Sequence, residues 1–545
     1  MARPARPSAG PSAGRPARTS RGASLATSLA VCGAAALALV LGASALTPAQ
    51  ATEQDTSTPA AARALARAAA ALAGTASSSG ASARATTGSS AASSGTGTDV
   101  TLALRDLYVL RSELSPTDQE TADSLLARPT DSSDADAYDR ASQMTCGTHV
   151  CVHWVSSGAD AATHAWVMKT LRVMEATWTK EVDDLGYRRP LSDGSLGSAY
   201  NGGNGKFDVY LTDLGDEGVY GYCAPDFHLV SHPKVGGGYC VLDNDYAVSD
   251  YGSASGPTLR VTAAHEFFHA IQFAYDYTED TWFMESTATW MEEVVADAVD
   301  DNRQYLRFGQ VRRPSVALDL SSSSWLGVYG NWAFWQHLTQ EKGRGIVLKA
   351  WRQAGAYSGA GQTYSTKALA RVLASRGGLV KAYARFSAAN LTPGRSYAEG
   401  GHWPTAPSSN RTLTVADPTW RTSRTLDHLT SRSLVVRPSA AVGEGYRLTV
   451  QVTAQRARAA KAAYVVVVRR TDGTMASHVV TADADGLATL TVPFDSAEVS
   501  KVSVTLVNGS TRYRCETGAS YSCDGSPRDD GLTQQVVLTA TPAVT

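Results

Sequence analysis

The chain has 545 residues, with 49 Lys or Arg and 51 Asp or Glu, so its formal net charge is -2. This length is too great for one compact core, and two or three folded units with appendages are expected. The balanced charge gives no electrostatic reason to expect nucleic acid as a partner, because proteins that bind nucleic acid usually carry a basic excess.

The N-terminal 51 residues have the features of a secretory signal peptide. Arginines within residues 3–21 precede an apolar run over 25–46, which ends in the small residues of 49–51. A positive region, an apolar region and a small-residue cleavage site in this order predict export with cleavage after Ala51. An uncleaved membrane anchor is the alternative, but alanine and glycine make the run only mildly hydrophobic. We therefore expect a secreted, extracellular protein with no stable membrane span after cleavage.

The cysteines support export. Loss of Cys32 with the signal leaves six, in three pairs that are close in sequence: Cys146/Cys151, Cys223/Cys240 and Cys515/Cys523. An even, clustered set in an exported protein predicts disulfide bonds, and pairing by proximity is the favoured connectivity. Scattered buried thiols are the alternative, and zinc binding by thiols is disfavoured in an oxidising compartment.

Residues 52–99 are dominated by Ala, Ser, Gly and Thr, which predicts a disordered linker. Within them, residues 61–73 have helix propensity but no apolar face of any size, so such a helix would have nothing to pack against. From Val100, leucines recur at largely helical spacing, and a second short apolar pattern ends near Leu126. We expect residues 100–140 to form a helical pro-region.

Residues 141–405 are expected to form an α+β domain. A strand-like stretch over 146–155 precedes a long amphipathic helix over 159–185, and residues 206–211 alternate as a strand does. A Gly-rich, cysteine-flanked loop is predicted over 223–240, ahead of a helix that contains two histidines. Further helical patterns lie at 332–337, 345–351 and 368–389.

Beyond residue 405 the pattern changes to short β-rich runs separated by turn residues. Runs at this spacing predict a C-terminal all-β sandwich over 406–545. The clearest runs are 433–436, 446–452, 463–468, 488–492 and 502–507.

The decisive segment lies between Ala264 and Gln272. His265 and His269 are four residues apart on a predicted helix, about 6 Å along its axis, so both imidazoles can bind one metal ion. Zinc accepts histidine nitrogens and keeps one position open for water in catalytic sites. Glu266 is placed to take a proton from that water. An ordinary helix with surface histidines is the structural alternative.

A catalytic zinc site needs a third protein ligand. The metzincin pattern is excluded, because Tyr275 occupies the position of its third histidine. Glu285 on the next predicted helix is the first choice, since a carboxylate on a helix that folds back beside the first is the gluzincin solution. Glu292 lies two turns, about 10 Å, further along, so it is the second choice or a residue that orients an imidazole N–H. Asp276 is the third choice.

Several other residues carry weaker signals. Asp243, Asp245 and Asp250 are a candidate calcium site, although acidic loops are usually only solvated. The strand at 206–211 is either the edge strand along which zincins align a peptide or an internal strand. A donor that stabilises the transition state is expected near the metal, and the candidates are Tyr329, Tyr275, His228 and His232.

The motifs also resemble a known family. They are His265–His269, Trp282–Ser286, Trp290–Glu293, Ala127–Thr130, Gly205–Leu211 and Tyr329-Gly330. Together they resemble a bacterial family of secreted zinc metalloproteases with a His-Glu-x-x-His helix, which is gluzincin-like and distantly similar to immune-inhibitor-A-type and thermolysin-like zincins. The resemblance covers most of the chain from about Val100. It implies a zincin-like catalytic domain, zinc bound by His265, His269 and Glu285, and Glu266 as general base.

We therefore expect a secreted zinc-dependent endopeptidase that acts on a protein or peptide substrate. Zinc-activated water would attack the peptide bond, and Glu266 would pass its proton to the leaving amine. One alternative is a zinc hydrolase of non-peptide amides or esters. Another is a non-catalytic adhesion or surface-binding protein, in which the β-domain binds and the histidine helix is vestigial.

Overall fold

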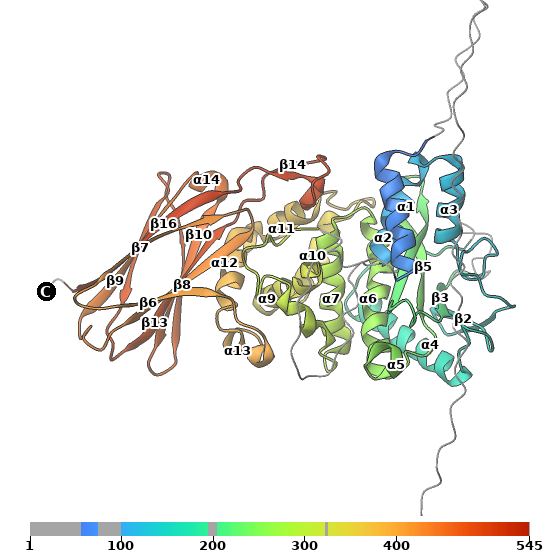
Figure 1. Cartoon of the computed structure of the whole chain (residues 1–545), viewed down its shortest axis with the longest axis horizontal. Helices are drawn as coiled ribbons and strands as arrows, with labels where there is room; N and C mark the ends of the chain where they lie inside the picture. Colours follow the sequence, from blue (N-terminus) through green and yellow to red (C-terminus); the bar gives the residue numbers. More distant parts are fainter. Residues whose placement is uncertain (1–55, 75–99, 195–203, 322–324, 544–545) are drawn as a thin grey trace, which may run out of the picture. The chain divides into compact units, whose positions relative to one another are not determined.

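The computed structural model describes residues 56–74, 100–194, 204–321 and 325–543. They form a mixed α/β structure, with helices and a mixed sheet followed by a β-rich C-terminal region (Figure 1). The predicted signal and most of the predicted linker, residues 52–55 and 75–99, lie outside the described residues. Within the described part of the chain, no helix combines the length and apolar character needed to cross a membrane.

Three helices precede the first strand: α1 (Pro59–Leu72), α2 (Val100–Leu110) and α3 (Pro116–Leu126). The prediction that residues 61–73 would have nothing to pack against is wrong. Helix α1 contacts α2 along a face of buried alanines, among them Ala61 and Ala68. A face of alanines lacks large apolar groups but lets a neighbouring helix approach closely, so these residues belong to a packed core.

The first sheet has five strands in the order β1-β2-β3-β5-β4. Strands β1 (Gln143–Cys146) and β2 (Val150–Trp154) form an antiparallel hairpin. Strand β3 (Phe207–Thr212) pairs in parallel with β2 and with β5 (His232–Asp243). Strand β4 (Gly221–Leu229) pairs antiparallel with β5 and forms the edge of the sheet.

Two sequence interpretations change with this topology. The strand predicted at 206–211 is internal, so its alternative reading as an edge strand is wrong. The loop predicted at 223–240 is the β4–β5 hairpin. A Cβ added at Gly238 would lie 1.9 Å from the carbonyl oxygen of Ala224, so glycine is required where the two backbones approach closely.

Helices cover this sheet. Helix α4 (His164–Trp178) continues into the π-helical segment η2 (Thr179–Asp184), where one helix was predicted over 159–185. Helix α6 (Ser255–Asp276) lies between the sheet and α7 (Thr281–Ala296), with contacts to β5 and α7 (Figure 1). Both α6 and α7 are buried on nearly all sides, which holds their side chains in fixed positions.

The helical region continues beyond α7. The predicted helix over 368–389 is two helices, because Gly377 and Gly378 adopt φ values of 98° and 85° between them. The remaining helical segments are η1 (Arg111–Glu113), α5 (Val248–Tyr251), η3 (Asp301–Arg307), α8 (Gly327–Gly330), α9 (Trp332–Lys342), α10 (Gly345–Ala354), α11 (Ser365–Leu373), η4 (Ala374–Arg376), α12 (Leu379–Ala389), α13 (Pro393–Ser396), η5 (Gly400–His402), α14 (Ala457–Ala460) and η6 (Ser522–Asp524).

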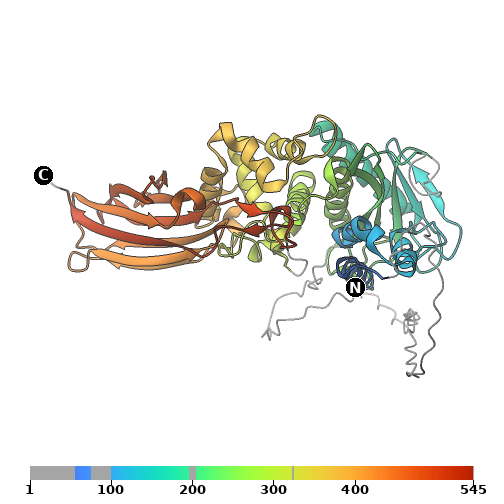
Figure 2. The ribbon, with the colours of Figure 1, turned by 90° about the horizontal axis from the view of Figure 1, so that it is seen from above.

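The C-terminal region contains two large sheets, with strand orders β11-β10-β13-β8-β6 and β12-β9-β16-β7, and a two-stranded sheet of β14 (Tyr513–Arg514) and β15 (Ser526–Pro527). The facing side chains of the two large sheets share one apolar core, and the two layers can be followed in Figure 2. All five predicted β-rich runs lie within strands of these sheets. The strands of the large sheets are β6 (Ser408–Leu413), β7 (Thr419–Leu426), β8 (Thr430–Pro438), β9 (Tyr446–Ala454), β10 (Ala462–Arg470), β11 (Met475–Thr481), β12 (Leu487–Pro493), β13 (Val499–Asn508) and β16 (Leu532–Pro542).

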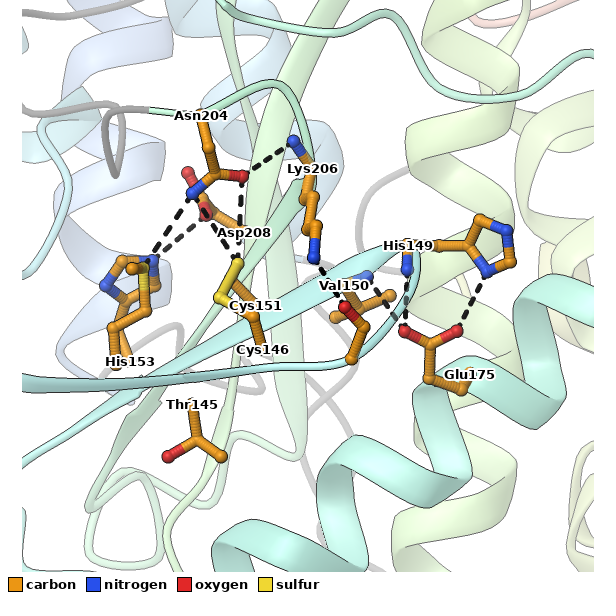
Figure 3. Close-up of a disulfide and its surroundings, with 12 residues drawn as sticks. Thr145, Cys146, His149, Val150, Cys151, His153, Glu175, Asn204, Lys206 and Asp208 are labelled. Atoms are coloured by element: carbon orange, nitrogen blue, oxygen red, sulfur yellow. Dashed lines mark hydrogen bonds and ion pairs between the residues drawn. A yellow bond between two sulfur atoms is a disulfide. The ribbon is translucent and has the colours of Figure 1, made fainter.

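The three predicted disulfides are confirmed: Cys146–Cys151, Cys223–Cys240 and Cys515–Cys523. The first joins β1 to β2 beside the turn that connects them (Figure 3). There the carboxylate of Glu175 on α4 accepts hydrogen bonds from the backbone N–H groups of His149, at 2.7 Å, and Val150, at 3.1 Å. These contacts attach α4 to the turn.

Asp319 connects the helical region to the C-terminal region. It is fully buried, and its carboxylate accepts hydrogen bonds from His428 Nε2 at 2.9 Å, Tyr513 Oη at 2.6 Å and Ser522 Oγ at 2.8 Å. Its partners all come from C-terminal residues, so the two regions share a buried polar cluster.

Candidate metal centre

Helices α6 and α7 bring three metal-binding side chains together. The Nε2 atom of His265 lies 3.4 Å from Glu285 Oε2, and the Nε2 atom of His269 lies 3.6 Å from Glu285 Oε1. One ligand atom from each residue lies within 4.8 Å of the other two. A tetrahedral zinc ion with bonds of about 2.0 to 2.2 Å holds its ligands about 3.3 to 3.6 Å apart. The donor set and its spacing therefore fit one such ion.

Each histidine is oriented by a second residue. The Nδ1 atom of His265 lies 2.7 Å from Glu292 Oε1, and the Nδ1 atom of His269 lies 2.8 Å from Gln272 Oε1. The amide nitrogen of Gln272 donates to the carbonyl oxygen of Met284 at 3.0 Å, which leaves its oxygen to accept from His269. When the rings are neutral, Nδ1–H donates to these oxygens, and Nε2, on the side of Glu285, is then the nitrogen that can bind a metal ion.

The surrounding charges favour a cation at this point. Burial lowers the pKa of His265, but hydrogen bonds to Glu285 and Glu292 outweigh it and raise that pKa well above the ordinary value. Burial also raises the pKa of Glu292 to about 7, against the opposing effect of His265. Carboxylates gathered around a buried imidazole therefore stabilise positive charge here.

Glu266 lies beside this group on α6 and is almost fully buried. Its Oε2 atom accepts a hydrogen bond of 2.9 Å from the hydroxyl of Thr101, which belongs to α2. The same hydroxyl accepts a hydrogen bond of 2.9 Å from the backbone N–H of Cys223 on β4. The predicted general base is thus in direct contact with the N-terminal helices.

A cavity of about 370 Å³ adjoins Glu285. Glu285 and Tyr329 line it, together with Arg105 of α2 and Ser520 of the C-terminal region. The ring of Tyr329 stacks near His265, with 6.0 Å between their centroids. Of the four candidate transition-state donors, Tyr329 is the one that shares the cavity with Glu285.

The other candidate donors have different surroundings. Tyr275 accepts a hydrogen bond from the backbone of Arg188, and its ring packs on Trp351. His228 contacts Tyr108. His232 contacts the hydroxyl of the neighbouring Ser231.

The structure separates the remaining predicted ligands from the centre. Asp276, the third choice, accepts hydrogen bonds from Thr278 at the end of α6 and is not part of the group. Asp243, from the predicted calcium site, accepts backbone hydrogen bonds from Leu214 and Asp245 and so supports a turn. Calcium at this turn stays a prediction.

A second acidic group lies elsewhere among the described residues. It contains Glu293, Asp297 and Glu399. Asn302 donates a hydrogen bond to Glu293, and Arg303 forms an ion pair with Glu399. These partners account for the cluster without an ion.

Sequence reasoning missed three residues near the centre. Gln272 was given no role, although its position three residues after His269 on one helix was a usable signal. Thr101 reaches Glu266 across 165 residues of sequence, so no local pattern indicates it. Glu181 of η2 is fully buried; burial raises its pKa well above the ordinary value, and the charge of His265 lowers it.

Comparisons with known proteins identify no family. No family model and no curated protein matches this chain. Among solved structures, the Aeromonas hydrophila periplasmic inhibitor of g-type lysozyme has 12% identity and a TM-score of 0.15, covering 25% of this chain and 100% of its own. A surface-associated copper-binding protein of Methylomicrobium album has 9% identity and a TM-score of 0.16, covering 25% of this chain and 98% of its own. These TM-scores are too low to indicate a shared fold.

Proposed function

We propose that this chain is a zinc-dependent endopeptidase of the zincin type, exported from the cell. The observation that carries the proposal is the convergence of three ligand atoms, from His265, His269 and Glu285, with both imidazoles oriented by a bonded Nδ1. A helix whose two histidines bound no metal would not need residues that orient both imidazoles.

The residues of the chain have distinct roles in this proposal. Zinc bound by the three ligands would acidify a water molecule and polarise the scissile carbonyl. Glu266 takes the proton of the attacking water and passes it to the leaving amine. Tyr329, which shares the cavity with Glu285, is the candidate donor to the oxyanion that develops at the carbonyl oxygen.

An extended peptide is the substrate that best suits the neighbouring sheet. Strand β4 is at the sheet edge and carries Cys223, whose backbone N–H points to the same hydroxyl that contacts Glu266. An edge strand can pair with an extended peptide through main-chain hydrogen bonds. A peptide bound along β4 would bring its backbone close to Glu266.

The first experiment measures zinc per chain by elemental analysis of the purified protein beside the double variant His265→Ala, His269→Ala. We expect about one zinc ion per wild-type chain and none in the variant. Equal zinc contents would show that any metal binds elsewhere and would contradict the proposed centre.

The second experiment separates metal binding from catalysis. Glu266→Gln should keep the zinc content of the wild type and lower peptide hydrolysis by about 10²- to 10⁴-fold, the usual contribution of a general base. Unchanged hydrolysis in this variant would contradict the proposed mechanism. Hydrolysis of esters but of no peptide in a substrate panel would favour the non-peptide alternative.

A further inference from the structure

Helix α2 contacts both Glu266 and the edge strand β4, which a peptide substrate would need to approach. The hydroxyl of Thr101 donates to Glu266 and accepts from the backbone of Cys223, at 2.9 Å in each case. The proposed mechanism assigns the first of these contacts to the attacking water and the second to the substrate backbone. Thr101 is fully buried, so its hydroxyl excludes solvent from Glu266 at this contact.

A second side chain anchors α2 beside the cavity. The guanidinium of Arg105 donates to the carbonyl oxygens of Tyr277, at 3.2 Å, and Glu279, at 2.9 Å, and to the hydroxyl of Thr281, at 3.2 Å. These partners lie in the connection from α6 to α7 or at its end. Arg105 therefore ties α2 to the segment that joins the histidine helix to the Glu285 helix.

The apolar face of α2 covers the edge strand. Leu104 and Leu107 are fully buried and share a core with Tyr222 and Ala224 of β4. Strand β4 therefore has a helix on it, in contact with the side chains that flank Cys223. An extended peptide could pair with β4 beside Glu266 only after α2 had moved away.

We propose that α2 is an autoinhibitory segment, which blocks Glu266 through Thr101 and covers β4 until it is displaced. This inference rests on the proposed function, because it concerns access to the same centre. It differs from a permanent structural role in one respect: disruption of the contacts of α2 should expose Glu266 while the rest of the molecule stays folded.

The chain has an exposed stretch in which a backbone cut would detach α2. Residues 139–144, between α3 and the body of the first sheet, are all exposed, and the stretch before β1 is irregular. The three disulfides formed by the described cysteines begin at Cys146 or later, so none ties α1, α2 or α3 to the sheet. A single backbone cut in this exposed stretch would leave the three helices attached only by non-covalent contacts.

The test uses the full-length, metal-free protein, so that its result does not depend on zinc. Carboxylates are labelled with a carbodiimide and glycine ethyl ester, and labelling of Glu266 is followed by mass spectrometry of peptides. The variants are Thr101→Val, the double variant Thr101→Val, Arg105→Met, and the control Thr121→Val. Thr121 is an exposed threonine of α3 whose hydroxyl bonds within its own helix.

We expect the double variant to label Glu266 at least about tenfold faster than the wild type, since one lost hydrogen bond to a charged group changes an opening equilibrium by that much. The Thr121→Val control should match the wild type. Glu181, fully buried and distant in sequence from α2, should stay unlabelled in every protein and report that the fold is intact.

A wild-type rate of Glu266 labelling in the double variant, with Glu181 protected, would overturn the inference. If the double variant loses its fold and Glu181 becomes labelled, the isosteric Thr101→Val variant decides: faster labelling of Glu266 supports the inference, and an unchanged rate overturns it. Exposure of Glu266 without peptide hydrolysis in the zinc-loaded protein would count against the proposed function and not against the block by α2.

Discussion

Each histidine of the candidate centre has one ring nitrogen bonded to a neighbour and the other directed at Glu285. This division of roles distinguishes Glu285 from Glu292, although both are buried carboxylates on one face of α7. Glu285 lies near both Nε2 atoms, whereas Glu292 contacts only the Nδ1 atom of His265. The geometry supports Glu285 as a ligand and Glu292 as the residue that orients an imidazole.

The two carboxylates should differ in their effect on metal binding. Glu292→Ala removes an orienting partner and should weaken zinc binding by about 10- to 100-fold. Glu285→Ala removes a ligand and should weaken it by considerably more. Competition with a chromogenic chelator measures both zinc affinities. A larger loss of affinity in Glu292→Ala than in Glu285→Ala would contradict the ligand assignment.

Tyr329 should affect turnover and not metal content. Tyr329→Phe keeps the ring that stacks near His265 but removes the hydroxyl, so we expect kcat to fall by about 10²- to 10³-fold with the zinc content unchanged. Tyr275→Phe is the matched control, because its hydroxyl contacts Arg188 and should leave kcat near the wild-type value. An equal loss in both variants would remove Tyr329 as the donor.

Local spacing predicted the residues of the centre that share one or two neighbouring helices. His265 and His269 follow from helix periodicity, and Glu285 follows from the helix immediately after them. Thr101 and Glu181 come from elements far upstream, and their approach to α6 depends on how the sheet and helices pack. No periodicity within one segment contains that information.

At the scale of elements, α3 is fixed to the first sheet by one buried arginine that follows it. The guanidinium of Arg128 is fully buried and pairs with Asp208 at 2.7 Å and with Asp193 and Asp226 at 2.8 Å each. The positive charge of the guanidinium offsets the repulsion among the three carboxylates. Its loss would leave them close together with little access to water.

Arg128→Met should therefore destabilise the protein by about 3 to 5 kcal/mol, the usual cost of removing one partner from a buried ion pair. Arg111→Met is the control, since its pair with Asp123 is largely exposed and is expected to contribute about 0 to 1 kcal/mol. Urea unfolding of both variants beside the wild type measures the difference. Equal free energies of unfolding for the two variants would contradict the role of Arg128.

Elements were predictable where large apolar residues alternate or recur, as in β3 and the C-terminal strands. The β4–β5 hairpin was predicted as a loop because its glycines resemble turn composition, although Gly238 serves close strand contact. Helix α1 was assigned to a linker because alanine gives little hydrophobic signal. Both errors concern small residues. Such residues let another element of the chain approach closely, so their role depends on a partner that is distant in sequence.

At the scale of the whole molecule, Asp319 and His428 hold the helical and C-terminal regions in one buried cluster. Burial lowers the pKa of His428, but Asp319 and Asp530 outweigh it and raise that pKa to about 10. Burial raises the pKa of Asp319, but His428 and its other hydrogen-bond donors outweigh it and lower that pKa. The pair is thus charged on both sides across the neutral range.

This ion pair predicts how stability depends on pH. The folded pKa of His428 lies above its unfolded value of about 6.5, so its contribution is complete below pH 6.5 and is lost as pH rises through 10. The wild type should lose stability over this window relative to His428→Gln. Urea unfolding at several pH values tests this, with His478→Gln, an exposed histidine of β11, as control. Parallel pH profiles for wild type and His428→Gln would contradict the prediction.

The three disulfides have a consequence for how the chain matures. Their cysteines are 5, 17 and 8 residues apart, so each bridge closes within a short stretch of chain. As the polypeptide emerges from its N-terminal end, each cysteine meets its partner before the next pair has appeared. Correct pairing therefore requires no contact between distant parts of the chain. Oxidation can proceed in the order of synthesis, with little rearrangement of mismatched disulfides.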